Sequence, residues 1–424
     1  MKWQMPKTLL GLAAIGLAAG ASIFAMPQKS DAQGAPVRIA YVDPLSGPMA
    51  GIGDTGLKNF QYILEEINAK GGVLGGRKLE IVPYDNKLNA QETIVQVQKA
   101  IDDGIRIITQ GNGTAFAIAI SEFVTKYNER NPGKEVVYLN YAAVDPILTN
   151  AKCSYWHFRW DANTEQKMAA ITNFLQNRKD VKKMYLINQD YAFGQGVRDL
   201  AVKMLKEKRS DIEIVGNELH PLAKVTDFSP YIAKIKASGA DSVITGNWGS
   251  DMALLVKAAA DAGLQVNFFT FYAGGTGGPT AIKQANLSDR VYAVGEGFAN
   301  IDHKSAHAFE KGLRAKYGVS LFYPRGVNQM RMLAAAINQA KSDDPKKFAA
   351  VLHGMKFEVF NGGEGTMRAD DHQFIQPLYM ASFGPLKAGQ EFDEEKTGWG
   401  WTIAGKIDAK DTLVPTTCKM NKPS

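Results

Sequence analysis

The stretch Ile67–Tyr84, INAKGGVLGGRKLEIVPY, predicts the end of a helix, two tight turns and the start of a strand. Apolar residues lead into it at i, i+3, i+4 and i+7, the spacing of a helix with one buried face. These residues are Phe60, Ile63, Leu64 and Ile67. Gly71 and Gly72 should end the helix, because glycine adopts the left-handed backbone conformation without a Cβ clash. Leu79 and Ile81 then alternate with polar neighbours, as in a strand. The stretch therefore predicts one helix–turn–strand unit.

The same alternation continues along the chain. Short, nearly apolar runs predict strands at Val37–Val42, Leu79–Val82, Ile105–Thr109, Val136–Asn140, Met184–Asn188, Ile212–Val215, Ser242–Thr245, Asn267–Phe271 and Val291–Val294. Helices are expected between them, at Ala90–Asp103, Gly196–Lys206, Phe228–Ala237 and Asp251–Ala262, and later at Asn328–Lys341. Apolar strands separated by helices indicate parallel sheets that are covered on both faces. The pattern pauses at Cys153–Asp161 and then restarts, so we expect an α/β protein with two doubly wound lobes. A length of 424 residues also favours two lobes over one domain.

The first 32 residues have the composition of a secretory signal peptide. Lys2 and Lys7 precede the apolar run Leu9–Met26, and Ser30 and Ala32 are small residues placed for cleavage before residue 33. The alternative is a membrane anchor, but the alanines and glycines of the run lower its hydrophobicity. We therefore expect cleavage and an exported, soluble mature protein, since no later segment has the composition of a membrane span.

Net charge and cysteine content indicate which partners and which compartment to expect for the protein. The net charge is +6, but the excess is scattered and no basic run is interleaved with aromatic residues, so nucleic acid is not an expected partner. The two cysteines, Cys153 and Cys418, would lie in an oxidising compartment after export, which favours a disulfide between them. Two unpaired thiols are the alternative.

Six loops follow predicted strands at the edge where open α/β sheets bind ligands. Each loop mixes small residues with a hydroxyl, an amide or an aromatic ring, as at the walls of a small-molecule cleft. The loops span residues 43–47, 110–114, 141–146, 189–194, 246–251 and 272–276. We therefore expect a ligand-binding cleft between the two lobes.

Motifs for catalysis, cofactors and metals are not found in these loops. The chain has no G-x-S-x-G, no P-loop and no strand-placed G-x-G-x-x-G. The pair His303 and His307 has i, i+4 spacing but lacks the glutamate of a zinc protease, so a solvated helix face is expected there. The sequence therefore predicts a binding protein that is not an enzyme and has no cofactor or metal.

Several segments together resemble one family, the solute-binding proteins of the leucine/isoleucine/valine-binding type, which supply ABC importers. The matching segments, in order, are VRIAYVDPLSGP, INAKGGVLGGRKLEIVPYDN, QDYAFGQG, VTDFSPYIAKIKASGADSVITG and VKAAADAGL. The resemblance implies two Rossmann-like lobes that are joined by three hinge segments and close over a solute. It also implies a monomer in the periplasm that docks on an ABC permease in the inner membrane. On this basis we expect residues 33–160 to begin the N-lobe, 161–295 to form the C-lobe, 296–372 to return to the N-lobe, and 373–424 to supply the last C-lobe strands and the tail.

The resemblance also implies roles for individual residues. In the family, a hydroxyl and backbone amides of the first lobe hold the ligand carboxylate; Thr114 falls at the hydroxyl position, and Ala142 and Ala143 at the amide positions. Val144 stands where a second hydroxyl is usual, and Ile52 where an aromatic is usual. The complete set of expected ligand-binding residues is Ser46, Ile52, Asn112, Thr114, Tyr141, Ala142, Ala143, Val144, Tyr191, Phe193, Trp248 and Tyr272.

One departure from the family pattern concerns the ligand. An acidic residue that normally pairs with the ligand ammonium is missing from the loop Tyr272–Thr276. Because an uncompensated buried charge is costly, the sequence favours a carboxylate without an α-amino group, such as an aromatic acid or a keto acid. A branched-chain amino acid, with Asp190 or Asp251 compensating, is the alternative ligand. A ligand-sensing domain of similar fold is the alternative function.

Overall fold

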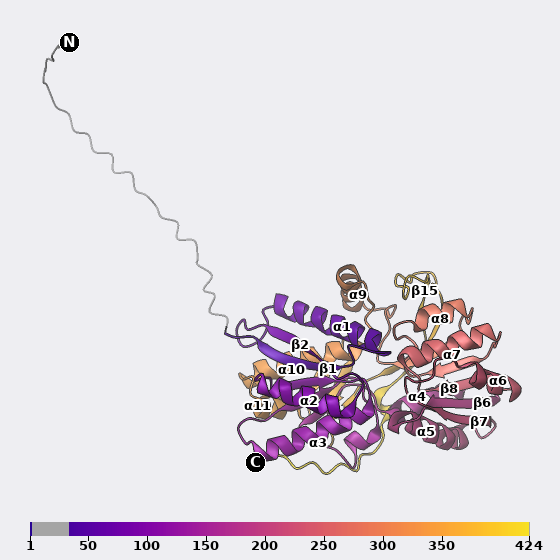
Figure 1. Ribbon diagram of the computed structural model, residues 1–424, viewed down its shortest axis with the longest axis horizontal. Helices are drawn as coiled ribbons and strands as arrows, with labels where there is room; N and C mark the ends of the chain where they lie inside the picture. Colours follow the sequence, from indigo (N-terminus) through magenta and orange to yellow (C-terminus); the bar gives the residue numbers. More distant parts are fainter. Residues whose placement is uncertain (2–33, 424) are drawn as a thin grey trace.

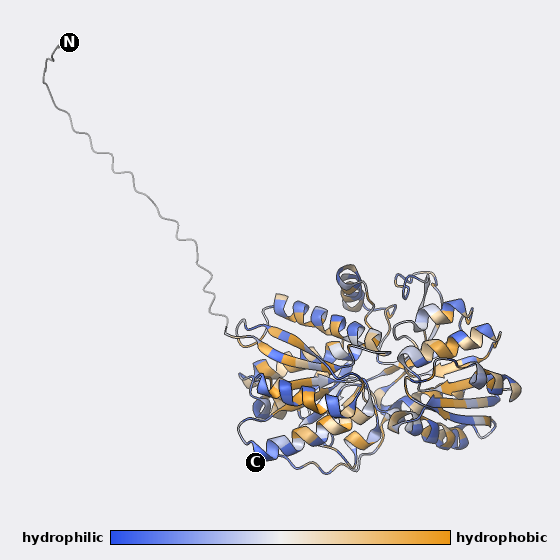
Figure 2. Ribbon diagram, in the orientation of Figure 1, coloured by the Kyte–Doolittle hydropathy of each residue, from blue (hydrophilic) through white to orange (hydrophobic). Residues whose placement is uncertain are grey.

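Two separate sheets form the cores of two α/β lobes that lie side by side (Figure 1). This computed structural model describes Met1 and residues 34–423. The predicted signal peptide therefore lies, apart from Met1, outside the described residues. Figure 2 shows apolar residues concentrated on the strands and on the helix faces turned toward them. The expected fold class, two doubly wound lobes, is confirmed.

The first lobe has a parallel five-stranded sheet in the order β2-β1-β3-β4-β5. Its strands are β1 (Val37–Asp43), β2 (Leu79–Asp85), β3 (Ile107–Gln110), β4 (Val137–Asn140) and β5 (His157–Arg159). Its helices are α1 (Ala50–Ala69), α2 (Ala90–Asp102), α3 (Thr114–Arg130), α10 (Pro324–Ala340) and α11 (Pro345–Leu352), with the 3-10 turn η1 (Pro146–Thr149). Helices α1, α10 and α11 pack together, and α2 packs beside α3.

The second lobe has a mixed seven-stranded sheet in the order β15-β14-β10-β9-β8-β6-β7. Its strands are β6 (Lys183–Gln189), β7 (Glu213–His220), β8 (Ser242–Thr245), β9 (Asn267–Thr270), β10 (Val291–Gly295), β14 (Leu378–Pro385) and β15 (Trp399–Ile407). Its helices are α4 (Thr164–Leu175), α5 (Ala192–Lys208), α6 (Ser229–Ala237), α7 (Gly249–Asp261) and α8 (Gly278–Gln284). The strands β14 and β15 run antiparallel to their neighbours.

The remaining elements lie in the segment between β10 and β14 and after β15. They are α9 (Lys304–Tyr317), a small sheet of β11 (Lys356–Glu358), β12 (Glu364–Met367) and β13 (Phe374–Ile375), and the 3-10 turn η2 (Ala409–Thr412). The chain passes between the two large sheets three times: after β5, after β10 and before β14. Beyond β15 it returns to the first lobe, where Cys418 forms a disulfide with Cys153.

The glycine-rich stretch at Ile67–Tyr84 has the predicted form. Helix α1 ends at Ala69, and Gly71, Gly72 and Gly75 all have positive φ. The Asn68 amide then holds the next strand in place: its Nδ2 donates to the Leu79 carbonyl and its Oδ1 accepts from the Leu79 amide, at 2.9 and 2.8 Å. A helix end and a strand start are therefore joined by one side chain. Among the described residues, no helix is long and apolar enough to cross a bilayer.

Candidate ligand-binding site

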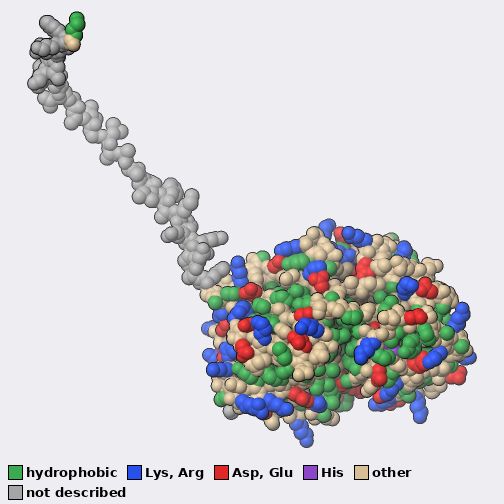
Figure 3. All heavy atoms as spheres, viewed as in Figure 1, with side chains coloured by type: hydrophobic (Ala, Val, Ile, Leu, Met, Phe, Trp, Pro, Cys, Tyr) green, Lys and Arg blue, Asp and Glu red, His purple; other side chains and the backbone are tan. Residues whose placement is uncertain are grey.

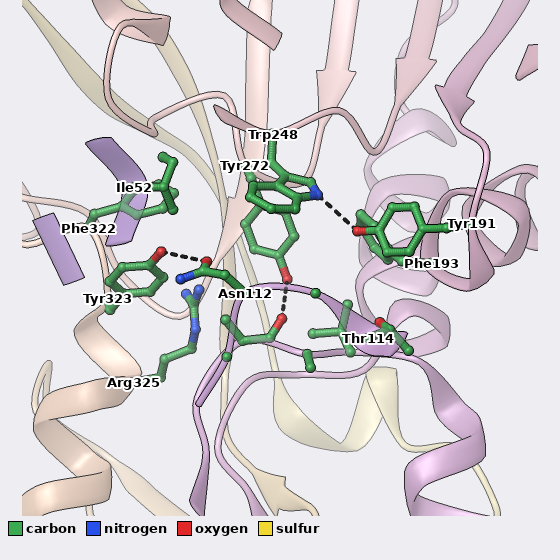
Figure 4. Close-up of a pocket in the computed structure, with 15 residues that line it drawn as sticks. Ile52, Asn112, Thr114, Tyr191, Phe193, Trp248, Tyr272, Phe322, Tyr323 and Arg325 are labelled. Atoms are coloured by element: carbon green, nitrogen blue, oxygen red, sulfur yellow. Dashed lines mark hydrogen bonds between the residues drawn. The ribbon is translucent and has the colours of Figure 1, made fainter. Parts of the chain in front are cut away.

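A cavity lies between the two lobes, at the carboxyl ends of both sheets (Figure 4). Its lining residues are Ile52, Gly111, Asn112, Gly113, Thr114, Ala142, Ala143, Val144, Tyr191, Phe193, Trp248, Tyr272, Phe322, Tyr323 and Arg325. They come from loops after β3, β4, β6, β8 and β9 and from the starts of α1 and α10. The cavity therefore has the position that ligand sites take in open α/β sheets.

The start of α3 forms one polar end of the cavity. Asp43, at the end of β1, accepts hydrogen bonds from the backbone amides of Gly111 and Asn112, which fixes the loop before α3. Gly113 has φ of 106°, and Thr114 is the first residue of the helix. Thr114 is 1% exposed, and its Oγ1 has no hydrogen-bond partner in the described part of the chain. A buried hydroxyl without a partner at a helix N-terminus is suited to receive an anion.

The two alanine amides that the family resemblance assigned to the carboxylate are already occupied. The backbone N–H groups of Ala142 and Ala143 both donate to Asn140 Oδ1, at 3.1 and 2.8 Å. Both residues line the cavity, but their amides would bind a ligand only by sharing or leaving Asn140. The donor set at this end is therefore centred on α3.

Aromatic rings from the second lobe form the facing wall. Tyr191 and Trp248 precede α5 and α7, and Trp248 Nε1 donates to Tyr191 Oη at 2.9 Å. The Phe193 and Tyr272 rings lie 5.9 Å apart. Tyr272 Oη donates to Asp161 Oδ2 at 2.8 Å, which holds the ring against the hinge. Rings held in this way make a rigid wall that suits a flat or apolar ligand.

Four buried charges lie at the hinge beside the cavity. Lys167 pairs with Asp161 at 2.5 Å, and Arg325 pairs with Asp161 at 3.1 Å and with Glu296 at 3.0 Å. Burial, with a contribution from Glu296, raises the pKa of Asp161 to about 7 although Arg325 and Lys167 oppose the shift. Burial also acts to raise the pKa of Glu296, but Lys167 and Arg325 outweigh it and hold that pKa well below its usual range. Of these four residues, only Arg325 lines the cavity.

Ten of the twelve residues expected from the sequence line the cavity: Ile52, Asn112, Thr114, Ala142, Ala143, Val144, Tyr191, Phe193, Trp248 and Tyr272. Ser46 and Tyr141 are the two that do not line it. Ser46 is exposed at the outer mouth of the cleft. Tyr141 is fully buried behind the wall, where its hydroxyl bonds to Asp43, Asn112 and Tyr41. Ligand contact by the other ten stays a prediction.

Five residues of the lining are not among the twelve expected: Gly111, Gly113, Phe322, Tyr323 and Arg325. The two glycines lie in the loop 110–114, which the sequence places at the cleft, and the other three were missed. The last three belong to the start of α10, which returns from the second lobe. The signal that could have found them is the run Phe322–Arg325, two aromatics, a proline and an arginine, directly before a helix.

The acids considered as partners for a ligand ammonium lie elsewhere. Asp190 is exposed at the cleft mouth, and Asp251 accepts bonds from Gln189 and the Ala223 amide. No aspartate or glutamate is among the described residues that line the cavity.

Within the described part of the chain there is also no cluster of three or more metal-ligating side chains. On the face shown in Figure 3, basic and acidic side chains are interspersed, without a continuous basic patch.

Comparison with known proteins gives consistent matches over most of the chain. A family model described as "Periplasmic binding protein" matches residues 36–390. The Leu/Ile/Val-binding protein homolog 4 of Brucella abortus (strain 2308) is 32% identical over 398 residues, which is 92% of this chain and 93% of the relative.

Solved structures agree in fold. The leucine-, isoleucine-, valine-, threonine-, and alanine-binding protein from Brucella ovis, in a closed conformation, superposes with a TM-score of 0.80 at 31% identity and covers 92% of this chain and 100% of that chain. A solute-binding protein of an ABC transporter from R. palustris, in complex with benzoate, has a TM-score of 0.75 at 18% identity and covers 91% of this chain and 99% of that chain. At that identity the second likeness concerns the fold.

Proposed function

This chain belongs to the periplasmic binding proteins, as a solute-binding protein of the leucine/isoleucine/valine type, and from that membership we propose its ligand and its partner. It is the periplasmic receptor of an ABC importer and binds a small apolar carboxylate in the interlobe cavity. Its partner is the permease in the inner membrane, to which the closed monomer delivers the ligand. The protein binds the ligand without turning it over.

The ligand class rests on one observation: the cavity has a site for an anion but no carboxylate for an ammonium. Thr114 Oγ1 and the N-terminus of α3 are positioned to bind the ligand carboxylate. Burying an α-ammonium without a counter-charge would cost several kcal/mol. We therefore favour an aromatic or keto acid that lacks the α-amino group, which also matches the aromatic wall.

A branched-chain amino acid is the second candidate. The names of the Brucella relatives, at 31–32% identity, favour it. In that case the ammonium would have to bind carbonyl and hydroxyl oxygens of the wall, such as the Tyr272 hydroxyl, in place of a carboxylate.

Matched ligand pairs separate the two candidates. Leucine and 4-methyl-2-oxopentanoate differ only at the α-carbon, and benzoate and cinnamate extend the panel to aromatic acids. A ligand that binds only the folded state stabilises it by about 2.7 kcal/mol at one hundred times Kd, so a thermal-shift screen followed by calorimetry will rank them. We expect the acids without an amino group to shift the melting temperature and leucine to shift it little. A strong shift by leucine with none by any des-amino acid would contradict the proposal.

A further inference from the structure

Arg325 has one donor group that the protein leaves unused. Its Nε bonds to the Tyr141 carbonyl and lies 3.1 Å from Asp161, and its Nη1 donates to Glu296 Oε2 at 3.0 Å. Its Nη2 has no hydrogen-bond partner among the residues that the structure describes, although the side chain is only 4% exposed. An unpaired buried donor on a charged group is costly, so such a group is normally satisfied when the site is filled.

Arg325 lines both the main cavity and a second, adjoining pocket. Tyr272, Phe322 and Arg325 line both spaces and form the partition between them. In the view of Figure 4, Arg325 lies to the lower left of Tyr272 and Thr114 to its lower right. Thr114 and Arg325 both line the main cavity, so a ligand of sufficient length with its carboxylate on Thr114 would contact Arg325 at its other end.

The charges around Arg325 define the group that this end can carry. Asp161 and Glu296 already pair with Lys167 and Arg325, so each cation of the hinge cluster has a carboxylate partner. A second carboxylate would add a buried charge without a counter-charge, which is costly. A neutral acceptor oxygen, as in an ether, a carbonyl or a hydroxyl, would satisfy Nη2 with a charge-assisted hydrogen bond.

We propose that the natural ligand is recognised at two points, with its carboxylate at Thr114 and a neutral acceptor oxygen at its distal end on Arg325 Nη2. This inference rests on the proposed function, since it takes the ligand to be an apolar carboxylate. It assigns Arg325 as the residue that selects oxygenated acids over plain hydrocarbon acids.

The test uses pairs of nearly identical shape that differ by one oxygen. In each pair the para substituent is methoxy in one member and ethyl in the other, on benzoate, phenylacetate, 3-phenylpropanoate and cinnamate scaffolds, so that ligand length also varies. Calorimetry on the full mature protein should show at least a tenfold preference for the methoxy member in one or more pairs. Equal affinities within every pair would overturn the proposal.

Variants then assign the preference to Arg325. In Arg325→Lys and Arg325→Met, the methoxy preference should fall below threefold. Arg331→Met, which removes a partly exposed arginine of the same helix paired with Glu66, should keep it. A preference that persists without Arg325, or an equal loss of affinity for both members of each pair, would overturn the proposal. If the Met variant does not fold, the Lys variant and the wild-type pairs decide. Strong binding of leucine with no binding of any acid would instead overturn the proposed function, and this inference with it.

Discussion

Thr114 combines a buried hydroxyl without a partner and a helix N-terminus at the cavity. Replacing it by valine keeps the shape but removes the hydrogen bond to the ligand carboxylate. We expect Thr114→Val to weaken binding of the best acid by about 1–3 kcal/mol, or roughly 5- to 150-fold in Kd, as for a charged acceptor left unpaired. Calorimetry measures this directly.

The control lies on the same helix. Thr125 Oγ1 bonds to the Ser121 carbonyl and to Ser154, away from the cavity. Thr125→Val should therefore change stability but leave Kd within about twofold. An unchanged Kd in Thr114→Val would remove Thr114 from the site.

Glu394 predicts a pH dependence of folding stability. Burial, with a contribution from Glu310, raises its pKa from 4.5 to about 8, although Arg314 opposes the shift. Between these two values the unfolded chain has lost the proton that the folded protein keeps, so this group lowers the free energy of unfolding as pH rises from 4.5 to 8. Below pH 4.5 Glu394 is protonated in both the folded and the unfolded state. Its full contribution to the free energy of unfolding, relative to high pH, is therefore present there.

Glu394→Gln should remove this contribution. Each unit of pKa difference corresponds to about 1.4 kcal/mol, so urea unfolding at pH 5 and pH 8 should show a clearly smaller loss of stability in the variant than in the wild type. Glu391→Gln, at an exposed position paired with Lys311, serves as the control. The same loss between pH 5 and pH 8 in both variants would show that Glu394 is ionised in the folded protein.

Contacts between the start of α1 and loops of the second lobe hold the cavity closed. Thr55 Oγ1 lies 2.9 Å from Thr276 Oγ1, and Thr276 Oγ1 donates to the Gly51 carbonyl. A Cβ at Gly275 would lie 2.8 Å from Ile52 Cδ1 and 3.4 Å from the Phe322 ring. A side chain at residue 275 would therefore require Ile52 to change its conformation while the cleft is closed.

Gly275→Val should disfavour closure, because its side chain would collide with Ile52 across the cleft. We expect at least a tenfold loss of ligand affinity and a smaller ligand-induced decrease in radius of gyration by small-angle scattering, with little change in stability without ligand. Gly196→Val places the same substitution on α5, where a Cβ meets nothing within 4 Å, and should bind normally. Full compaction with ligand in Gly275→Val would show that closure tolerates the larger residue.

The same elements show which features the sequence could predict. The strand expected at Ser242–Thr245 is observed as β8 with the same bounds. It could be predicted because an apolar run between polar residues marks both ends of a buried strand. Helix α5 was expected from Gly196 but begins at Ala192, since its first turn is part of the loop QDYAFG and shows no helical period. Most cavity residues lie in loops that directly follow predicted strands, so the predicted strand ends also locate these residues.

Other cavity residues could not be predicted from local pattern. Arg325 lies about 180 residues after Tyr141 in the sequence, yet its Nε bonds to the Tyr141 carbonyl, because the chain returns to the first lobe only after completing most of the second. The sequence places Tyr141 in the loop after a predicted strand and so among the expected ligand-binding residues. Its direction, toward Asp43 and away from the cavity, is decided by packing between β1, β3 and β4.

The tail after β15 is a fourth connection between the lobes, in addition to the three hinge segments. It leaves the second lobe and runs along the first, where Thr416 Oγ1 donates to the Thr149 carbonyl at 2.6 Å and Lys422 contacts His353. Figure 1 shows the C-terminus beside the first lobe. The Cys153–Cys418 disulfide makes this connection covalent across a sequence separation of 265 residues.

Removing the disulfide should therefore affect the stability of the protein more than its binding. A cross-link over so long a loop restricts the unfolded chain strongly, so Cys418→Ser should lower the free energy of unfolding by about 2–5 kcal/mol. No described residue of the tail lines the cavity, so Kd should stay within about twofold. Urea unfolding with and without dithiothreitol measures the first effect, and the Cys153→Ser/Cys418→Ser double variant should not respond to the reductant. A loss of affinity at unchanged stability would contradict this expectation. It would mean that the tail, which connects the two lobes, acts on their closure over the ligand.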